Sequence, residues 1–263
     1  MLIRRFKLAA LALTTLMGSA LLLAPPTVAA ASTRQSVAET HAPMQPTPPG
    51  GSPLPALAGT ISTTNWSGYI ATGATFSSVS ASWVVPTVTC TKGKKYFAAW
   101  VGLDGFSSRT TLEQIGTDSD CAAGTPRYYA WDEMYPAAPF VLAKLVTAGD
   151  QMNASVVVTT ATTFALTIAD ATKGWTRTFA KTLATAKRSS AEIIQEAACC
   201  SAGGAVLPLA NFGKINVTNA SVDGSPIGNV APTRINMAAG GVMKATTSGL
   251  TLKKNFSVTW NHR

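Results

Sequence analysis

The hydrophobic periodicity of the chain beyond residue 60 is two rather than 3.6. Short runs rich in β-branched and aromatic residues alternate with turn signals such as Asp104-Gly105 and Lys173-Gly174. The strongest runs are 78–85, 97–101, 155–160, 163–168, 215–218 and 256–260. We find no capped amphipathic helix longer than two turns. Many short strands at this spacing predict an all-β fold, an antiparallel β-sandwich of two sheets, in one domain over residues 61–263.

The first 31 residues have the pattern of a secretory signal peptide. A basic start precedes an apolar run over residues 8–23, and small residues at 28–31 suit cleavage. A membrane anchor is the alternative, but the run is short and is closed by Pro25-Pro26, which favours cleavage. We therefore expect the protein to be secreted into the extracellular space without a stable membrane anchor.

Residues 32–60 are rich in proline and glycine, which precludes regular structure and favours an extended chain. We interpret this stretch as a pro-segment or a linker. One of the two histidines, His41, lies in it, and the other, His262, is the next-to-last residue. Neither position suits the rigid base of a Ser-His-Asp or Cys-His site, or one of several zinc ligands.

Charged residues are scarce, at 13% of 263 residues, about half the usual share. The 21 Lys and Arg outnumber the 12 Asp and Glu, but they are scattered rather than gathered in a stripe, so we expect no nucleic-acid partner. Motifs for zinc peptidases, phosphate-binding loops and dinucleotide binding are absent from the sequence. Any chemistry must therefore use carboxylates, amides and hydroxyls, and we expect no metal and no cofactor.

The four cysteines suit an exported, oxidised protein, and three pairings are possible. Cys90 and Cys121 flank a strongly patterned block, and a bridge between them would pin a loop beside it. We predict this disulfide. Cys199 and Cys200 form either a vicinal disulfide or two separate thiols.

Strand alternation places Glu192, Ile194 and Glu196 on one face. A carboxylate beside Ile194 could be partly desolvated, and its raised pKa would suit general acid–base chemistry. The alternative, which the pattern alone favours, is a solvated outer face with both glutamates in water. Gln114 could hold a water or stabilise an oxyanion through its amide, although a lone glutamine more often serves as an ordinary polar residue.

Several sequence motifs follow one another along the chain. They are Asn65-Trp66-Ser67-Gly68-Tyr69, Trp83-Val84-Val85-Pro86, Trp100-Val101-Gly102-Leu103-Asp104-Gly105, Leu112-Glu113-Gln114-Ile115-Gly116-Thr117-Asp118, Ala130-Trp131-Asp132-Glu133-Met134-Tyr135-Pro136, Ser190-Ala191-Glu192-Ile193-Ile194-Gln195-Glu196 and Asn211-Phe212-Gly213. This ordered set resembles the glutamic peptidases of family G1, the eqolisins, in a bacterial-type form. The resemblance implies a concanavalin A-like (lectin-like) β-sandwich whose catalytic site lies on a concave face.

By this resemblance, the catalytic pair falls on Gln114 and Glu192. Six further residues match positions that line or support the family's substrate site: Trp100, Asp104, Asp118, Trp131, Glu133 and Tyr135. Fungal members have Trp where this chain has Ile193 and Met134, and usually Asp where it has Tyr129. These departures fall on pocket walls, so they bear on substrate preference.

The sequence thus predicts a monomeric endopeptidase that hydrolyses protein or peptide substrates with an activated water, at acidic pH as the resemblance implies. Two alternatives belong to other classes. One is a β-sandwich glycoside hydrolase that uses Glu133 and Glu192 as its carboxylate pair. The other is a non-catalytic carbohydrate-binding module, for which the aromatic block over residues 128–136 would supply stacking surfaces.

Overall fold

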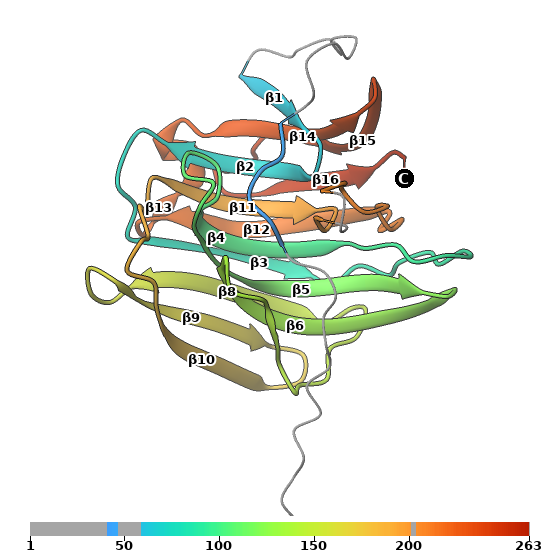
Figure 1. Cartoon of the computed structure of the whole chain (residues 1–263), viewed down its shortest axis with the longest axis horizontal. Coiled ribbons are helices and arrows are strands. Elements are labelled where there is room, and N and C mark those ends of the chain that lie inside the picture. The colour runs from blue at the N-terminus through green and yellow to red at the C-terminus, as the bar shows by residue number, and fades with distance from the viewer. Residues whose placement is uncertain (1–40, 47–58, 201–203, 263) are drawn as a thin grey trace, which may run out of the picture. The chain divides into compact units, whose positions relative to one another are not determined.

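The computed structural model describes residues 41–46, 59–200 and 204–262, which belong to one compact unit. The predicted signal peptide and most of the predicted pro-segment lie outside these residues. Sixteen described strands join in one hydrogen-bonded sheet (Figure 1). Apart from a single 3-10 turn at Ile227–Val230, these residues contain no helix, and so none that is long and apolar enough to cross a membrane. The all-β prediction is confirmed.

The strands are β1 (Thr60–Thr63), β2 (Trp66–Thr72), β3 (Ser78–Val84), β4 (Ala98–Asp104), β5 (Leu112–Ala122), β6 (Thr125–Tyr135), β7 (Phe140–Val141), β8 (Gln151–Val158), β9 (Thr163–Asp170), β10 (Trp175–Thr182), β11 (Ser190–Glu196), β12 (Lys214–Val222), β13 (Ser225–Pro226), β14 (Thr233–Ala239), β15 (Val242–Thr247) and β16 (Phe256–Trp260). Their order is β10-β9-β8-β3-β12-β16-β15-β14-β2-β11-β4-β5-β6-β7, with β1 beside β14 and β13 beside β12. All neighbours are antiparallel except β1 and β14.

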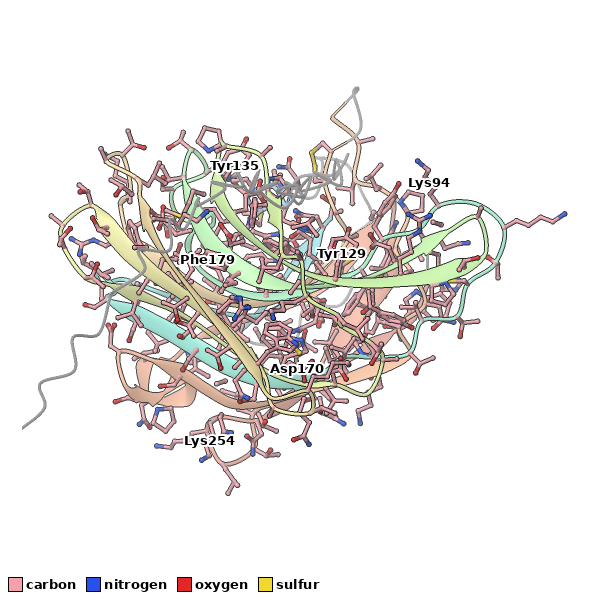
Figure 2. All side chains as sticks on the ribbon, turned by 90° about the horizontal axis from the view of Figure 1, so that it is seen from below. Lys94, Tyr129, Tyr135, Asp170, Phe179 and Lys254 are labelled. Carbon is pink, nitrogen blue, oxygen red and sulfur yellow. A yellow bond between two sulfur atoms is a disulfide. The ribbon has the colours of Figure 1, made fainter. Side chains whose placement is uncertain are left out.

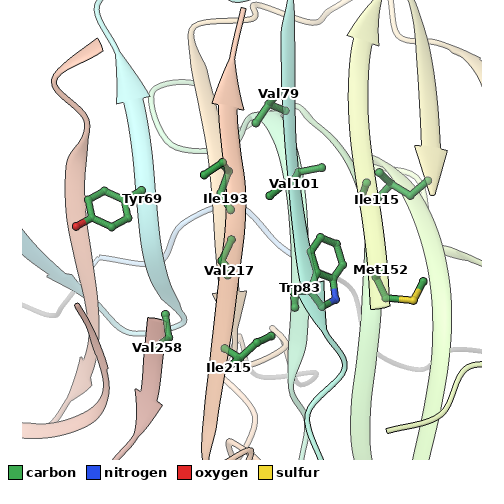
Figure 3. Close-up of a cluster of buried hydrophobic side chains, with 14 of the residues drawn as sticks. Tyr69, Val79, Trp83, Val101, Ile115, Met152, Ile193, Ile215, Val217 and Val258 are labelled. Atoms are coloured by element: carbon green, nitrogen blue, oxygen red, sulfur yellow. The ribbon is translucent and has the colours of Figure 1, made fainter. Parts of the chain in front are cut away.

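The long sheet folds over itself, so that β4 and β5 pack against β8, and β11 packs against β3. The main hydrophobic core fills the space between these two layers, and Val101, Ile115 and Ile193 contribute to it from one side (Figure 3). Outer strands show the expected alternation: in β9, every second residue is buried. This is the two-layered sandwich predicted from the period of two.

Strands β4 and β11 depart from this alternation, because all seven residues of each are buried. One face of these strands contributes to the main core. The opposite face carries a second hydrophobic cluster that includes Trp66, Trp100 and Trp131. A strand covered on both faces has no solvent side, which explains the nearly continuous apolar run at the start of β4.

Disulfides join Cys90 to Cys121 and Cys199 to Cys200. The first bridge ties the end of β5 to the loop that precedes β4, with the two Cα atoms 5.4 Å apart. Of the two options that the sequence left open for Cys199 and Cys200, the structure has the vicinal disulfide.

Candidate active site

The register of the sheet places the two predicted catalytic residues in one row. Glu192 of β11 lies opposite Gly102 of β4, which lies opposite Gln114 of β5, which lies opposite Glu133 of β6. Directly opposed residues of antiparallel strands point to the same face. The backbones of Glu192 and Gln114 are two strand spacings apart, about 10 Å. The three polar side chains therefore share the face that carries the tryptophan cluster.

Gly102 lies between Glu192 and Gln114 in this row and carries no side chain. A Cβ there would lie 3.0 Å from Leu112 Cδ1 and 3.0 Å from Trp100 Cζ3, tighter than ordinary contacts. The site thus has a glycine between Glu192 and Gln114 because neighbouring side chains already close over this position.

Gln114 is held by hydrogen bonds from its amide nitrogen. Its Nε2 donates to Glu133 Oε2 at 3.0 Å and to the His41 carbonyl oxygen at 2.6 Å. Its Oε1 is buried and accepts no hydrogen bond from any residue that the structure describes. The amide nitrogen therefore donates to one peptide carbonyl and to one carboxylate, and the amide oxygen remains for another partner.

Glu192 is fully buried. Burial raises the pKa of its carboxyl well above the ordinary value, and the nearby carboxyls of Asp104 and Glu113 raise it further. Hydrogen bonding by Ser190 and by the backbone of Phe106 offsets part of this effect. The expectation of a solvated outer face for Glu192 and Glu196 is wrong, because β2 and β4 flank β11 and the second cluster covers its outer face.

Glu133 is also buried, and burial raises its pKa to about 8 despite hydrogen bonds from Gln114 and from the His41 backbone N–H. Glu196 accepts hydrogen bonds from Trp100 Nε1 at 2.8 Å and from Asn65 Nδ2 at 3.3 Å. Burial, with Glu133 nearby, raises the pKa of Glu196 well above its ordinary value. Trp100 thus orients a carboxyl of the site.

The Tyr129 hydroxyl lies between the carboxyl groups of Asp118 and Asp120. Tyr129 Oη lies 2.7 Å from Asp118 Oδ2 and 2.7 Å from Asp120 Oδ2, and one hydroxyl proton can satisfy only one of these carboxylates. Burial raises the pKa of Asp118 well above its ordinary value, and the Asp120 charge adds to this. We infer that this pair holds a proton. Trp131 Nε1 donates to Asp118 Oδ1 at 2.6 Å.

Asp104 accepts several hydrogen bonds from the protein itself. It is buried and accepts hydrogen bonds from Thr111 Oγ1 and from the backbone N–H groups of Lys187, Arg188 and Ser189, at 2.7–3.1 Å. These contacts anchor the turn that leads into β11, the strand that carries Glu192. Tyr135, half-buried at the end of β6, packs against the second cluster.

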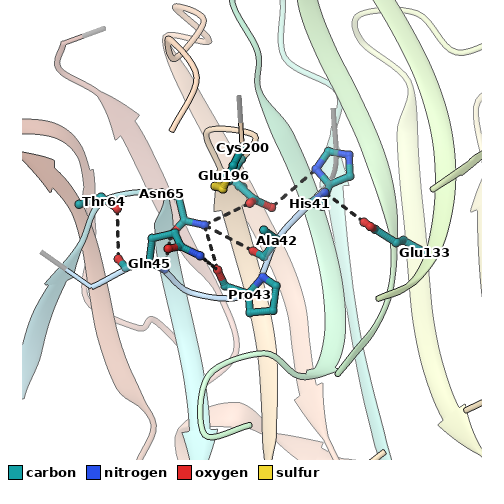
Figure 4. The surroundings of a disulfide bond; sticks show 10 residues. His41, Ala42, Pro43, Gln45, Thr64, Asn65, Glu133, Glu196 and Cys200 are labelled. Carbon is teal, nitrogen blue, oxygen red and sulfur yellow. Dashed lines mark hydrogen bonds and ion pairs between the residues drawn. A yellow bond between two sulfur atoms is a disulfide. The ribbon is translucent and has the colours of Figure 1, made fainter. Parts of the chain in front are cut away.

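His41 lies inside the site, although its place in the Pro-rich stretch gave no sign of this. Its ring is fully buried and stacks on Trp131, with ring centroids 3.7 Å apart and planes 9° apart. Its Nε2 lies 3.5 Å from Asp118 Oδ1. Its Nδ1 lies 3.6 Å from Glu196 Oε2 (Figure 4). Burial lowers the pKa of His41 to about 3.

Acidic residues are gathered inside the protein to an unusual degree. The structure describes eleven of the 12 Asp and Glu, all but Glu39. Only Asp223 of these eleven is exposed. The ten buried acids are Asp104, Glu113, Asp118, Asp120, Asp132, Glu133, Asp150, Asp170, Glu192 and Glu196. Since buried charges are costly, such a concentration is typical of a functional site.

Comparisons with known proteins agree with this geometry. The model of the Peptidase A4 family matches residues 64–260. The chain is 26% identical over 209 residues to aspergillopepsin-2 of Aspergillus niger, covering 70% of this chain and 73% of that protein. It is 34% identical over 113 residues to scytalidopepsin B of Scytalidium lignicola, covering 42% and 41%.

Solved structures give the same result. Scytalido-glutamic peptidase with a transition-state analogue inhibitor matches with a TM-score of 0.67 and 26% identity, over 75% of this chain and 98% of that one. Aspergilloglutamic peptidase from Aspergillus niger shares the fold, with a TM-score of 0.54 at 24% identity over 64% and 99%. Neither a glycoside hydrolase nor a carbohydrate-binding module is the family of this chain. It belongs to the Peptidase A4 family, the glutamic endopeptidases known as eqolisins.

Proposed function

We propose that this endopeptidase uses Glu192 and Gln114 as its catalytic pair, and that it is a secreted enzyme that cleaves protein substrates at acidic pH. The observation that carries the proposal is their common row on one sheet face, with Gly102 between them. A carboxylate and an amide so placed can act from both sides on a peptide bond that lies across β4.

In the proposed reaction, ionised Glu192 removes a proton from a water molecule as the water oxygen attacks the scissile carbonyl carbon. Gln114 Nε2 donates a hydrogen bond to the oxygen of that carbonyl, which becomes an oxyanion in the tetrahedral intermediate. Glu192 then passes the proton to the leaving nitrogen while the C–N bond breaks. The products are a carboxylic acid and an amine, and Glu192 is ionised again.

Glu133 supports this role of Gln114. Because Glu133 Oε2 accepts a hydrogen bond from Gln114 Nε2 at 3.0 Å, it fixes which end of the amide faces the substrate. Trp131 and Trp100 offer flat apolar walls on either side of Gly116 in the neighbouring row. We propose that these residues, with Asp118 and Tyr135, bind the substrate chain, and that Asp104 holds β11 in place.

The proposed acidic optimum requires that one carboxylate of this crowded face ionises while its neighbours stay protonated. Burial raises the pKa of Glu133 to about 8 and those of Glu192 and Glu196 well above their ordinary values. As the pH rises, these groups lose their protons one after another, because each ionised carboxylate disfavours ionisation of the next. We therefore expect activity where one carboxylate is ionised and its neighbours keep their protons.

The test is cleavage of an unfolded protein substrate by Glu192→Gln and Gln114→Ala variants from acidic to neutral pH. We expect kcat to fall by a factor of about 10² to 10⁴ without the base, and by about 10² to 10³ without the oxyanion donor. Gln151→Ala, a change at an exposed glutamine of β8, is the matched control and should retain activity. Full activity of either site variant would remove that residue from the mechanism.

Glu133→Gln separates two assignments of the base, because Glu133 is the carboxyl that contacts Gln114 directly. The amide substitute still accepts a hydrogen bond, so we expect a smaller fall in kcat than for Glu192→Gln. If Glu133→Gln were inactive and Glu192→Gln active, Glu133 would be the base.

A further inference from the structure

The Tyr129 hydroxyl joins two carboxyl groups at one end of the candidate active site. Asp118 and Asp120 are two positions apart on β5, so both side chains point to the face that carries Gln114. Tyr129 of β6 lies opposite Asp118 in the register, and its Oη lies 2.7 Å from Asp118 Oδ2 and 2.7 Å from Asp120 Oδ2. Both acids are buried. The hydroxyl therefore bridges two carboxyl groups that have little access to water.

The other oxygen of each carboxyl group accepts a hydrogen bond from a nitrogen. Trp131 Nε1 donates to Asp118 Oδ1 at 2.6 Å, and the backbone N–H of Phe97 donates to Asp120 Oδ1 at 3.1 Å. In a protonated carboxyl group the carbonyl oxygen is the better acceptor, and the other oxygen carries the proton. A proton on either acid is therefore best placed on Oδ2, where it faces the tyrosine.

The hydroxyl fixes how many protons the two acids hold. Burial, with Asp118 and Asp120 nearby, raises the pKa of Tyr129 well above its ordinary value, so the hydroxyl keeps its own proton. It has one proton to donate and lone pairs with which to accept. It can donate to one carboxylate and accept from the other acid only if that acid is protonated. The contacts are thus satisfied when the pair carries one proton and one negative charge.

Two arrangements with the same number of protons satisfy these contacts. In the first, protonated Asp118 donates to Tyr129 Oη, and Tyr129 donates to ionised Asp120. In the second, protonated Asp120 donates to Tyr129 Oη, and Tyr129 donates to ionised Asp118. The first becomes the second when one proton moves from Asp118 Oδ2 to Oη while another moves from Oη to Asp120 Oδ2. The negative charge then lies on Asp118, and no proton is gained from the solvent or lost to it.

Asp118 is the member of the pair that faces the interior of the site. The His41 ring, which belongs to the described segment of residues 41–46, stacks on Trp131, and its Nε2 lies 3.5 Å from Asp118 Oδ1. The place beside Asp118 therefore admits a planar group that carries nitrogen. Glu196 of β11 is the other nearby acid, and its charge disfavours a charge on Asp118.

Asp120 lies farther along β5, away from Gln114. It lies opposite Arg127 of β6 in the register, and the Arg127 side chain is exposed. The backbone of Lys95 pairs with the end of β5, but its Nζ donates to Thr91 Oγ1 and to the carbonyl oxygen of Lys92. With a neutral group beside Asp118, the negative charge is therefore favoured on Asp120, which is farther from Glu196.

We propose that Tyr129 is a specificity-determining residue, whose hydroxyl keeps one negative charge on the pair and allows this charge to lie on Asp118 or on Asp120 according to the substrate. A cationic side chain over Trp131 draws the charge onto Asp118, whereas a neutral side chain leaves it on Asp120. Arginine suits the cationic case, because its planar guanidinium stacks on an indole and binds a carboxylate. This inference rests on the proposed function, in which Asp118 and Trp131 bind the substrate chain.

The experiment compares peptides that differ only in charge. A peptide that the protein cleaves is prepared with arginine or with citrulline at each position around the cut in turn, because citrulline has nearly the same shape and no charge. The ratio of kcat/KM for arginine to kcat/KM for citrulline is measured at one acidic pH, where arginine remains charged. Asp118→Asn puts a neutral amide in the pocket, so the position at which this variant lowers the ratio identifies the side chain that enters it.

Asp120→Asn and Tyr129→Phe test the bridge at that position. With an amide at residue 120, the charge must lie on Asp118, and the ratio should rise at least about tenfold. Without the hydroxyl, ionised Asp118 loses a charge-assisted hydrogen bond, and the ratio should fall at least about tenfold. Tyr128→Phe is the matched control, because it removes a hydroxyl that accepts from Val88 N–H instead, and it should leave the ratio unchanged. A merely structural defect would lower kcat/KM for both peptides alike.

A second measurement does not depend on cleavage. Carbon NMR of the aspartate carboxyl groups follows the ionisation of Asp118 and Asp120 as the pH changes. We expect one of the two to remain protonated at a pH where exposed Asp223 is fully ionised. In Tyr129→Phe, the first ionisation of the pair should move up by at least about one pH unit, which corresponds to the tenfold change in the ratio.

The results distinguish this proposal from the proposed function. If the protein cleaves no peptide, the proposed function fails, and the titration alone decides whether the two acids share a proton. Ionisation of both acids together with Asp223 would overturn the shared charge. In an active enzyme, ratios that move in the same direction in Asp120→Asn and Tyr129→Phe, or in neither, would overturn the role of the hydroxyl. Melting temperatures show whether each variant is folded, and one folded variant of the two is enough for the test.

Discussion

Glu113 offers a quantitative test of how the protein treats its buried carboxyls. It follows Leu112 on β5, on the face opposite Gln114, and is fully buried. Burial, with the charge of Asp104 nearby, raises its pKa from 4.5 to about 9. The folded chain therefore keeps this proton up to about pH 9, whereas the unfolded chain loses it above pH 4.5. Because the folded state binds the extra proton, its stability falls as the pH rises through this window.

The size of the effect follows from the two pKa values. Above pH 4.5, the free energy of unfolding falls by about 1.4 kcal/mol for each pH unit. Because pH 7 lies 2.5 pH units above 4.5, the protein is less stable at pH 7 than at pH 4 by about 3 kcal/mol. A Glu113→Gln variant keeps the shape and lacks the titration. Its free energy of unfolding relative to the unchanged protein should therefore rise by about 3 kcal/mol between pH 4 and pH 7.

Urea unfolding at intervals from pH 4 to pH 8 measures this difference. Gln151→Ala is the control, because Gln151 is an exposed residue of β8 that does not titrate. Its curve should run parallel to that of the unchanged protein. A constant difference between Glu113→Gln and the unchanged protein at every pH would refute the reasoning, since Glu113 would then titrate as it does in water.

Three further predictions concern the packing, the disulfide and the segment of residues 41–46. Gly116→Ala would place a Cβ 2.5 Å from the Cβ of Trp100, so we expect it to destabilise the protein by about 3 kcal/mol or more. Circular dichroism should show a lower melting temperature, and an unchanged melting temperature would contradict the close packing. Replacing Cys90 and Cys121 by alanine removes a cross-link between residues 31 positions apart. Because the cross-link restricts the unfolded chain, its loss should lower the free energy of unfolding, measured in urea, by about 3 to 4 kcal/mol. An unchanged free energy of unfolding would contradict this explanation. Burial lowers the pKa of His41 from 6.5 to about 3, so between these pH values the free segment carries a proton that the bound segment lacks. Binding of the segment to the site should therefore weaken by up to about tenfold for each pH unit as the pH falls. Hydrogen exchange of the segment's amides measures this change. Stronger binding in acid would mean that the surrounding carboxyls hold an imidazolium instead.

The fold was predictable because period-two alternation is a local property. The runs at 78–85 and 163–168 correspond to β3 and β9, and turn residues mark their ends. Alternation also placed Glu192 and Glu196 on one face correctly. Their burial was not predictable in this way, because it depends on β2 and β4 lying on either side of β11.

Contacts between distant segments explain the other differences. His41 and Glu133 are 92 positions apart, and nothing near either residue indicates that they meet. The proline-rich composition predicts an extended chain around His41, but composition carries no information about which surface an extended chain covers. Asn65 was within reach of prediction, since it opens the first family motif, and the structure places its amide on Glu196.

The burial of the acidic side chains changes the net charge of the folded protein. The formal charge of +9 counts every Asp and Glu as ionised, yet the raised pKa values of Glu113 and Glu133 keep these two carboxyls protonated near neutral pH. The folded protein therefore carries more positive charge than its sequence implies, while lysines such as Lys94 lie at its periphery (Figure 2). Unfolding near pH 7 releases those protons to the solvent, so the unfolded chain is the less cationic of the two states.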